Sequence, residues 1–267
     1  MVNANLKVEL FHLRPWSFSK VQKAKKCQYE FYFRYVEKLK PLERADFFVL
    51  GSGVHFVLEN ALLRALKEGK PLSEANLTDF ALRFKEVEPS ADVSKIAQFF
   101  PNILKFVNGQ LRRLKGSSFF EPEVELAVDS SFNLSSYFSG EVFMRGKLDF
   151  VFERDGTLYI VDHKTSRSLE FDNRVKTQLR WYALLASVKF PSFERFALEL
   201  HNVRYGTIQR IIFTQRDIKL FKKRLIPLIA QVEGELSGKS FSQLLPSPRE
   251  ENCRWCEYRH VCPAVTP

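Results

Sequence analysis

The sequence predicts an α/β fold in which helices flank a mixed central sheet. Three observations indicate it: a hairpin signal at Asp155-Gly156, segments rich in β-branched and aromatic residues, and apolar residues at helical spacing elsewhere. Strands are expected at residues 123–128, 142–153, 157–163, 195–202 and 207–214, and helices at 56–68, within 73–115, at 175–187 and at 217–236. The helix at 175–187 lies between two predicted strands, so we expect it to cross over the sheet.

We predict one domain over residues 1–267, with a helical insertion at about 65–118 and a cysteine-bearing C-terminal segment at 237–267. A chain of 267 residues that is 45% hydrophobic can bury a substantial core. The first 20 residues contain no apolar run of signal-peptide type, and no run of about 20 apolar residues follows. These features predict a cytoplasmic protein.

The charge balance favours an anionic partner. The formal net charge is +10 and the isoelectric point is near 9.4, which makes nucleic acid the leading candidate, with general basicity as the alternative. A substrate channel is expected between the helical part and the sheet. Candidates to line it are Lys23, Lys25, Lys26, Arg112, Arg113 and Lys176.

The segment GKLDFVFERDGTLYIVDHK, residues 146–164, predicts the position of a charged site. Asp155-Gly156 between two strand-like runs is a strong signal for a tight hairpin. If Arg154 pairs with Thr157, counting back along the two strands places Asp149 opposite Asp162.

Two facing carboxylates need a positive partner, because like charges directly opposed across strands are destabilising. Lys164 lies on the same strand face as Asp162, two residues further on, and can supply part of that charge. Two carboxylates at an interior strand end also suit a hard cation such as Mg²⁺ or Mn²⁺. The alternative is a structural ion pair between Lys164 and one aspartate, which leaves the second carboxylate unexplained. Glu125 is a weaker acidic candidate and is expected to be an exposed strand residue.

Four cysteines predict a second site. Cys253, Cys256 and Cys262 form a C-x2-C-x5-C loop near the end of the chain, and Cys27 lies near its start. Four thiolates are the ligand set of a structural zinc ion or of a cubane iron-sulfur cluster. Either site would join the N- and C-terminal regions. The alternative is a set of inert buried thiols.

The pattern G-x-x-D, hairpin, D-x-K resembles the catalytic core of the PD-(D/E)XK nuclease superfamily, here as Gly146, Asp149, Asp162 and Lys164. The lone N-terminal cysteine with the C-terminal C-x2-C-x5-C is similar to the iron-sulfur subgroup of RecB-like nucleases, which includes AddB and the CRISPR-associated iron-sulfur exonucleases. Residues 16–36 also resemble the start of those domains. The resemblance implies a restriction-endonuclease-like fold and a [4Fe-4S] cluster, with zinc as the alternative from spacing alone.

Two further segments fit this resemblance. In LGSGVHFVLENAL, residues 50–62, Gly51 and Gly53 are expected just before a helix whose first turns carry His55, a metal ligand in the family. The alternative is a satisfied core histidine. Gln178 and Tyr182 are four residues apart and project from one helix face. They resemble the Q-x-x-x-Y element that lies against the active site of RecB-like nucleases, although an amphipathic helix could carry them incidentally.

The resemblance implies a metal-dependent deoxyribonuclease, acting on single-stranded DNA or on DNA with free ends, in repair, recombination or defence. His55, Asp149, Asp162 and the backbone carbonyl of His163 would hold Mg²⁺ or Mn²⁺, and Lys164 would act on the attacking water. The His163 side chain, on the opposite strand face, is not expected to be a ligand. The rival interpretation is a non-catalytic DNA-binding or scaffold module of a helicase-nuclease complex. The chain has no Walker A motif, so a helicase activity would reside on a partner.

Overall fold

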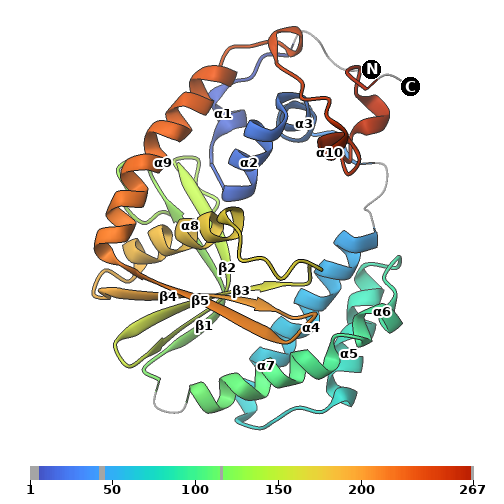
Figure 1. Ribbon diagram of the computed structural model, residues 1–267, viewed down its shortest axis with the longest axis vertical. Helices are drawn as coiled ribbons and strands as arrows, with labels where there is room; N and C mark the ends of the chain where they lie inside the picture. Colours follow the sequence, from blue (N-terminus) through green and yellow to red (C-terminus); the bar gives the residue numbers. More distant parts are fainter. Residues whose placement is uncertain (1–5, 42–45, 115–116, 266–267) are drawn as a thin grey trace. The chain divides into compact units, whose positions relative to one another are not determined.

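The computed structural model contains a mixed five-stranded sheet with the strand order β1-β2-β3-β4-β5 (Figure 1). The strands are β1 (Phe120–Val128), β2 (Met144–Arg154), β3 (Thr157–Lys164), β4 (Arg195–Asn202) and β5 (Thr207–Thr214). β2 pairs with β3 and β4 with β5 antiparallel, whereas β3 and β4 are parallel. The predicted α/β class with a mixed sheet is confirmed.

The structure describes residues 6–41, 46–114 and 117–265. Residues 115–116, near the predicted end of the helical insertion, and residues 1–5 and 266–267, at the predicted domain limits, lie outside the described residues. The chain divides into two compact units. Unit 1 comprises Met1–Arg44, Ala127–Gly146 and Leu220–Pro267, and unit 2 comprises Ala45–Leu126 and Lys147–Lys219.

Helices supply most of the remaining structure. The α-helices are α1 (Leu10–Leu13), α2 (Phe18–Lys26), α3 (Gln28–Phe31), α4 (Asp46–Glu68), α5 (Glu74–Val87), α6 (Val93–Ala97), α7 (Phe100–Arg113), α8 (Asn173–Lys189), α9 (Gln215–Leu236) and α10 (Glu250–Cys253). A π-helix covers Tyr32–Val36, and 3-10 helices cover Phe241–Gln243 and Arg259–Val261. The predicted helical stretch 73–115 is therefore three helices, α5 to α7.

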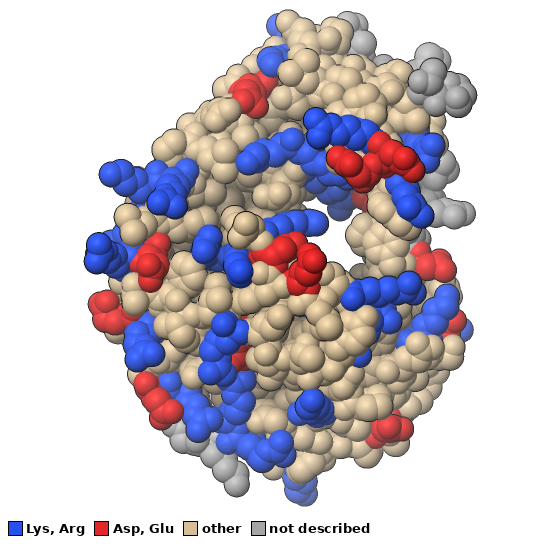
Figure 2. All heavy atoms as spheres, in the orientation of Figure 1, with Lys and Arg blue, Asp and Glu red and all other residues tan. Residues whose placement is uncertain are grey.

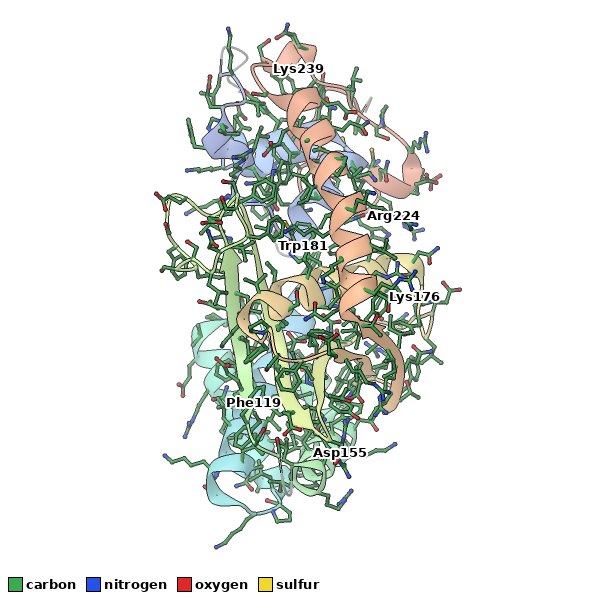
Figure 3. All side chains as sticks on the ribbon, turned by 90° about the vertical axis from the view of Figure 1, so that its left-hand side faces the viewer. Phe119, Asp155, Lys176, Trp181, Arg224 and Lys239 are labelled. Atoms are coloured by element: carbon green, nitrogen blue, oxygen red, sulfur yellow. The ribbon has the colours of Figure 1, made fainter. Side chains whose placement is uncertain are left out.

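The β2–β3 hairpin has the predicted register. Arg154 pairs with Thr157, and Asp155 and Gly156 both have positive φ, 50° and 68°, as a tight hairpin turn requires. Figure 3 labels Asp155 at this turn. The hairpin has five residue pairs in this register, from Arg154 and Thr157 at the turn to Phe150 and Val161. The turn alone therefore determines which residues reach the far ends of both strands.

Two layers of helices enclose the sheet within unit 2. Helices α4 to α7 bury their apolar faces against one another and against Phe150, Phe152 and Val161, which share one face of the sheet. Helix α8 contacts β3 and β4 and lies on the other side of the sheet (Figure 1). The site described below lies where β3 ends between these layers.

The start of α4 differs from the expectation, because Gly51 and Gly53 lie inside the helix. A Cβ at Gly53 would lie 2.5 Å from Ile96 Cδ1 and 3.0 Å from the Phe84 ring, and one at Gly51 would lie 3.4 Å from Thr165 Oγ1. Close packing requires Gly53, and it offsets the roughly 1 kcal/mol that a helical glycine costs.

Among the described residues, α4 is the one helix long and apolar enough to cross a membrane by length and composition. Val54, Val57 and Ala61 on this helix are fully buried in the core of unit 2. A core helix of a soluble protein passes the same test, so α4 is weak evidence for a membrane span.

Candidate active site

Asp149 and Asp162 lie one residue beyond the last paired residues of β2 and β3, Phe150 and Val161. Asp149 contacts β3 through its side chain: the carboxylate Oδ2 accepts a hydrogen bond from the backbone N–H of His163 at 2.7 Å. The carboxylate takes the place of a strand partner for β3. Both residues predicted to face each other thus lie at one end of the hairpin.

Asp162 is almost completely buried and is contacted by Lys164 and Gln178. Lys164 Nζ lies 2.9 Å from Oδ1 and 2.7 Å from Oδ2, and only the contact with Oδ1 has hydrogen-bond geometry. Gln178 Nε2 donates to Oδ1 at 3.2 Å. Burial raises the pKa of Asp162, the Lys164 ammonium opposes this rise and the Asp149 carboxylate adds to it. A desolvated carboxyl group beside a second acid favours a nearby cation.

Helix α8 carries Gln178 and Tyr182 to this site on one face, one turn apart. Gln178 Nε2 also donates to Tyr182 Oη at 2.8 Å, so the amide joins the tyrosine to Asp162. Asp172 caps the start of the helix by accepting the N–H of Val175 at 2.8 Å. The i, i+4 spacing in the sequence therefore corresponds to a direct contact.

His55 and His163 approach the same strand end from the α4 side. His55 Nδ1 lies 3.8 Å from Asp149 Oδ2. The His163 ring is buried beside the rings of His55, Phe106 and His201, and neither of its nitrogens has a hydrogen-bond partner among the described residues. Burial lowers the pKa of His163 well below its usual value, so the imidazole is neutral. Its side chain lies on the strand face opposite Asp162, as predicted.

The donor set around the strand end suits a hard divalent cation, because it combines two carboxylates with an imidazole. Within residues 6–41, 46–114 and 117–265, no three His, Cys, Asp or Glu side chains converge closely enough to hold one ion. Asp149, Asp162 and His55 supply suitable ligand types without converging on one point, and Asp162 Oδ2 is a buried oxygen that has no hydrogen-bond partner among the described residues.

Two acids near this site were missed by the sequence interpretation. Glu59 lies one helical turn after His55, and burial, followed by the Glu123 carboxylate, raises its pKa. Glu123 forms an ion pair with Lys147, two residues before Asp149. The i, i+4 spacing from His55 could have identified Glu59. Glu123 gave no local signal, since it comes from a different strand and has a positive φ of 51°. Glu125 is exposed, as expected.

Arg113 does not line a channel as expected. Its guanidinium donates two hydrogen bonds, of 2.9 and 2.8 Å, to the fully buried carboxylate of Glu199. Arg210 Nε and His201 Nε2 complete the set around Glu199 at 2.7 and 2.8 Å. Burial alone would raise the pKa of Glu199, but these partners lower it to about 2. Arg113 is thus part of an internal charge network.

The other basic candidates divide into paired and exposed residues. Lys23 and Lys26 form ion pairs with Glu30, and Lys176 lies over the Phe171 ring. Lys25 and Arg112 are exposed. Figure 2 shows Lys and Arg spread over the face in view, with Asp and Glu in smaller groups. Basic character is therefore a property of the surface rather than of the six predicted residues.

The four cysteines come together in unit 1. Cys27, Cys253, Cys256 and Cys262 are free thiols that line one cavity. Burial raises the pKa of Cys256 to about 11, and burial followed by the nearby Cys27 raises that of Cys262. Hydrogen bonds between Gln28 and Leu245, 3.3 Å from N–H to carbonyl and 2.9 Å from N–H to Oε1, join the two chain regions beside them.

No three of these thiols converge closely enough to hold one metal ion, within the part of the chain that the structure describes. Four thiolates are the ligand set of a structural zinc ion and also of a cubane iron-sulfur cluster.

Comparison with known proteins assigns the chain to a family. The profile of the PD-(D/E)XK nuclease superfamily matches residues 15–263. Comparison with curated proteins gives no match. Among solved structures, the "Putative exonuclease" of Eubacterium rectale is 13% identical with a TM-score of 0.55, covering 100% of this chain and 95% of that one. The crystal structure of SSO0001 is 20% identical with a TM-score of 0.34, and the match covers 79% of this chain and 96% of that one. Since the profile match spans nearly the whole sequence, this chain belongs to the PD-(D/E)XK nuclease superfamily.

Proposed function

We propose that the protein is a Mg²⁺- or Mn²⁺-dependent deoxyribonuclease of the RecB-like, AddB-like group. One observation carries the proposal: Asp149, Asp162 and Lys164 meet at the end of the β2–β3 hairpin, with Gln178 bound to the buried Asp162. Membership of the nuclease superfamily supports a phosphodiester hydrolase. The profile match runs through both units, which supports treating residues 1–267 as a single nuclease domain with an insertion at about 65–118.

Each residue has a defined role in this proposal. Asp149, Asp162, His55 and the His163 backbone carbonyl would hold the metal, which when bound supplies Lewis acidity and lowers the pKa of a bound water. Lys164, now paired with Asp162, orients the attacking water and offsets negative charge on the phosphate in the transition state. Gln178 fixes the Asp162 carboxylate, and Tyr182 fixes Gln178.

The substrate is proposed to be DNA that is single-stranded or has free ends. The net charge of +10 supports a polyanionic substrate, and the Eubacterium rectale structure is named as an exonuclease. A cytoplasmic role in repair, recombination or defence, with a helicase as a partner protein, fits this substrate.

The four cysteines are proposed to bind a [4Fe-4S] cluster, with zinc as the alternative. Support comes from the four thiols that line one cavity and from the C-x2-C-x5-C spacing of three of them. The thiols would ionise on binding, since the ligand of a metal is the thiolate. The cluster would stabilise unit 1 and leave catalysis to the carboxylates.

The function is tested by incubating purified protein with end-labelled linear and circular single-stranded DNA, with Mn²⁺ or with chelator. We expect Mn²⁺-dependent degradation of the linear substrate, and matched RNA would establish the sugar preference. Tight DNA binding without cleavage of any substrate, under all metal conditions, would instead indicate the scaffold module.

A further inference from the structure

The segment directly after Lys164 is held in an unusual way. Five consecutive backbone carbonyls, of residues 164–168, accept hydrogen bonds from the turn between β4 and β5. The bonds are Val203 N to Lys164 O (2.8 Å), Arg204 Nε to Thr165 O (3.1 Å), Asn202 Nδ2 to Ser166 O (3.2 Å) and Ser168 O (2.9 Å), and Tyr205 Oη to Arg167 O (3.1 Å). We call residues 165–168 the TSRS loop and residues 202–206 the clamp turn.

The clamp turn is itself anchored to the helical layer of unit 2. Asn102 Nδ2 donates to Arg204 O and Lys105 Nζ donates to Gly206 O, both at 2.9 Å. Gly206 has φ +65°, and a Cβ there would lie 2.4 Å from Asn102 Oδ1. Helix α7 therefore fixes the turn, and the turn fixes the loop beside the catalytic lysine.

The N–H groups of the TSRS loop are in the opposite situation. None of the four donates a hydrogen bond to any residue that the structure describes. The Arg167 guanidinium is exposed and has no carboxylate partner among the same residues, and Ser166 is exposed beside it. Solvent water can satisfy these donors, so the arrangement costs little.

Backbone N–H groups without a protein acceptor and an arginine guanidinium on the same short loop are donors that suit a phosphate group. The loop begins one residue after Lys164, whose ammonium contacts Asp162. A phosphate on these amides would therefore belong to the same strand as the phosphate to be cleaved.

We propose that the TSRS loop binds a backbone phosphate of the nucleic-acid substrate next to the scissile one, and that Asn202 and Arg204 are positioning residues that hold its amides ready. This inference rests on the proposed nuclease function, and it assigns substrate binding to a loop and a turn outside the predicted catalytic residues.

The test uses binding rather than cleavage, so that it can be separated from the proposed activity. The dissociation constant of a fluorescein-labelled single-stranded oligonucleotide is measured in chelator, for wild type and Arg167→Ala. We expect Arg167→Ala to weaken binding about tenfold, as loss of one charge-assisted contact would. Arg195→Ala is the matched control, because Arg195 is an exposed arginine at the other end of β4 from Asn202. It should bind as wild type does.

A thermodynamic cycle then identifies the contact. Oligonucleotides carrying one neutral methylphosphonate at successive positions are bound to both proteins. At one position neutralisation should weaken wild-type binding, yet weaken Arg167→Ala by much less. If the effects of Arg167→Ala and of phosphate neutralisation on the binding free energy are additive at every position, the proposal is overturned, even if the enzyme cleaves DNA.

The positioning role has its own readout. Asn202→Ala should lower the backbone order parameters of residues 165–168, measured by 15N relaxation, and weaken oligonucleotide binding several-fold. Arg204→Lys, which keeps the charge, should lower the order parameters less. If Asn202→Ala does not fold, the Arg167 cycle still tests the phosphate contact. Unchanged order parameters of the loop in a folded Asn202→Ala would refute the positioning role of the clamp turn.

Discussion

The strand-end site and the cysteine cavity hold their ligand groups in different ways. At the strand end, the fold itself positions the carboxylates: Asp149 accepts the His163 N–H, and Asp162 accepts hydrogen bonds from Lys164 and Gln178. In unit 1 the thiols line a cavity, and burial raises the pKa of Cys256 to about 11, so that thiol is protonated at neutral pH without a bound metal.

The difference predicts different responses to loss of metal. A site preorganised by a sheet should keep its geometry without an ion. A site whose ligands must ionise on binding couples metal affinity to the stability of the surrounding fold. Catalytic and structural metals should therefore be separable by mutation.

The largest effect is expected from Lys164→Ala. Losing the ammonium removes both the partner of Asp162 and the proposed transition-state charge, so cleavage should fall on the order of a thousand-fold or more. Single-turnover cleavage of labelled DNA in Mn²⁺ measures this, with circular dichroism to verify folding. Glu125→Gln, at an exposed acid of β1, is the control and should leave the rate unchanged. A fully active Lys164→Ala would remove lysine from the mechanism.

The next effect concerns stability. Cys256→Ala should lower the free energy of unfolding of unit 1 by several kcal/mol if the proposed cluster joins Cys27 to the C-terminal loop, because the variant loses one of its ligands. Limited proteolysis should then cleave both near Cys27 and after Leu236, while the β2–β3 hairpin stays protected. Brown colour and iron content should fall together, whereas a colourless protein with one equivalent of zinc would favour the zinc alternative. No change in metal content or protease pattern would show that the thiols are inert.

A third effect concerns acid and the buried network of Glu199. Its pKa is about 2 in the folded protein against an ordinary value of 4.5. A carboxylate whose pKa is lowered by folding stabilises the fold at pH values above its pKa in the unfolded chain. This contribution is lost as the pH falls from about 4.5 through about 2. It amounts to on the order of 3 kcal/mol. Urea denaturation between pH 7 and pH 2 should show the loss in wild type.

In Glu199→Gln the stability at pH 7 should already be low, and the same pH range should show a shallower change. Equal pH dependence in both proteins would assign acid sensitivity to other carboxylates.

The smallest effect is expected from His163→Phe. The imidazole is neutral and its nitrogens have no hydrogen-bond partner in the described part of the chain, so a similar aromatic ring should change the free energy of unfolding by less than about 1.5 kcal/mol. Cleavage should stay within about threefold of wild type, since only the backbone carbonyl of His163 is proposed as a ligand. His55→Phe is the contrasting variant and should lose activity. Equal losses of cleavage activity in the two variants would indicate that the His163 side chain is a metal ligand.

Local chemistry explains which parts of the site could be predicted from the sequence. Asp155-Gly156 determines the hairpin register, and the register places Asp149 and Asp162 at one strand end. The spacing of Gln178 and Tyr182 gives their contact directly. Both predictions depend on neighbours along one strand or one helix.

The rest depends on contacts between distant segments. Arg113 meets Glu199, 86 residues away, and Asn202 reaches Ser168 over 34 residues because β3 and β4 are parallel. No local pattern distinguishes these residues from surface charges or turn residues. The start of α4 was misplaced for a related reason, since packing against Ile96 and Phe84 explains Gly53 and no helix break is needed.

The strand-end site is tested most directly by Mn²⁺ binding, followed by electron paramagnetic resonance, in wild type, Asp149→Asn/Asp162→Asn and Cys256→Ala. We expect wild type to bind one or two Mn²⁺ ions per chain, the double variant to lose this binding, and Cys256→Ala to retain it in large part. Unchanged Mn²⁺ binding by Asp149→Asn/Asp162→Asn would contradict a metal site at the end of the β2–β3 hairpin.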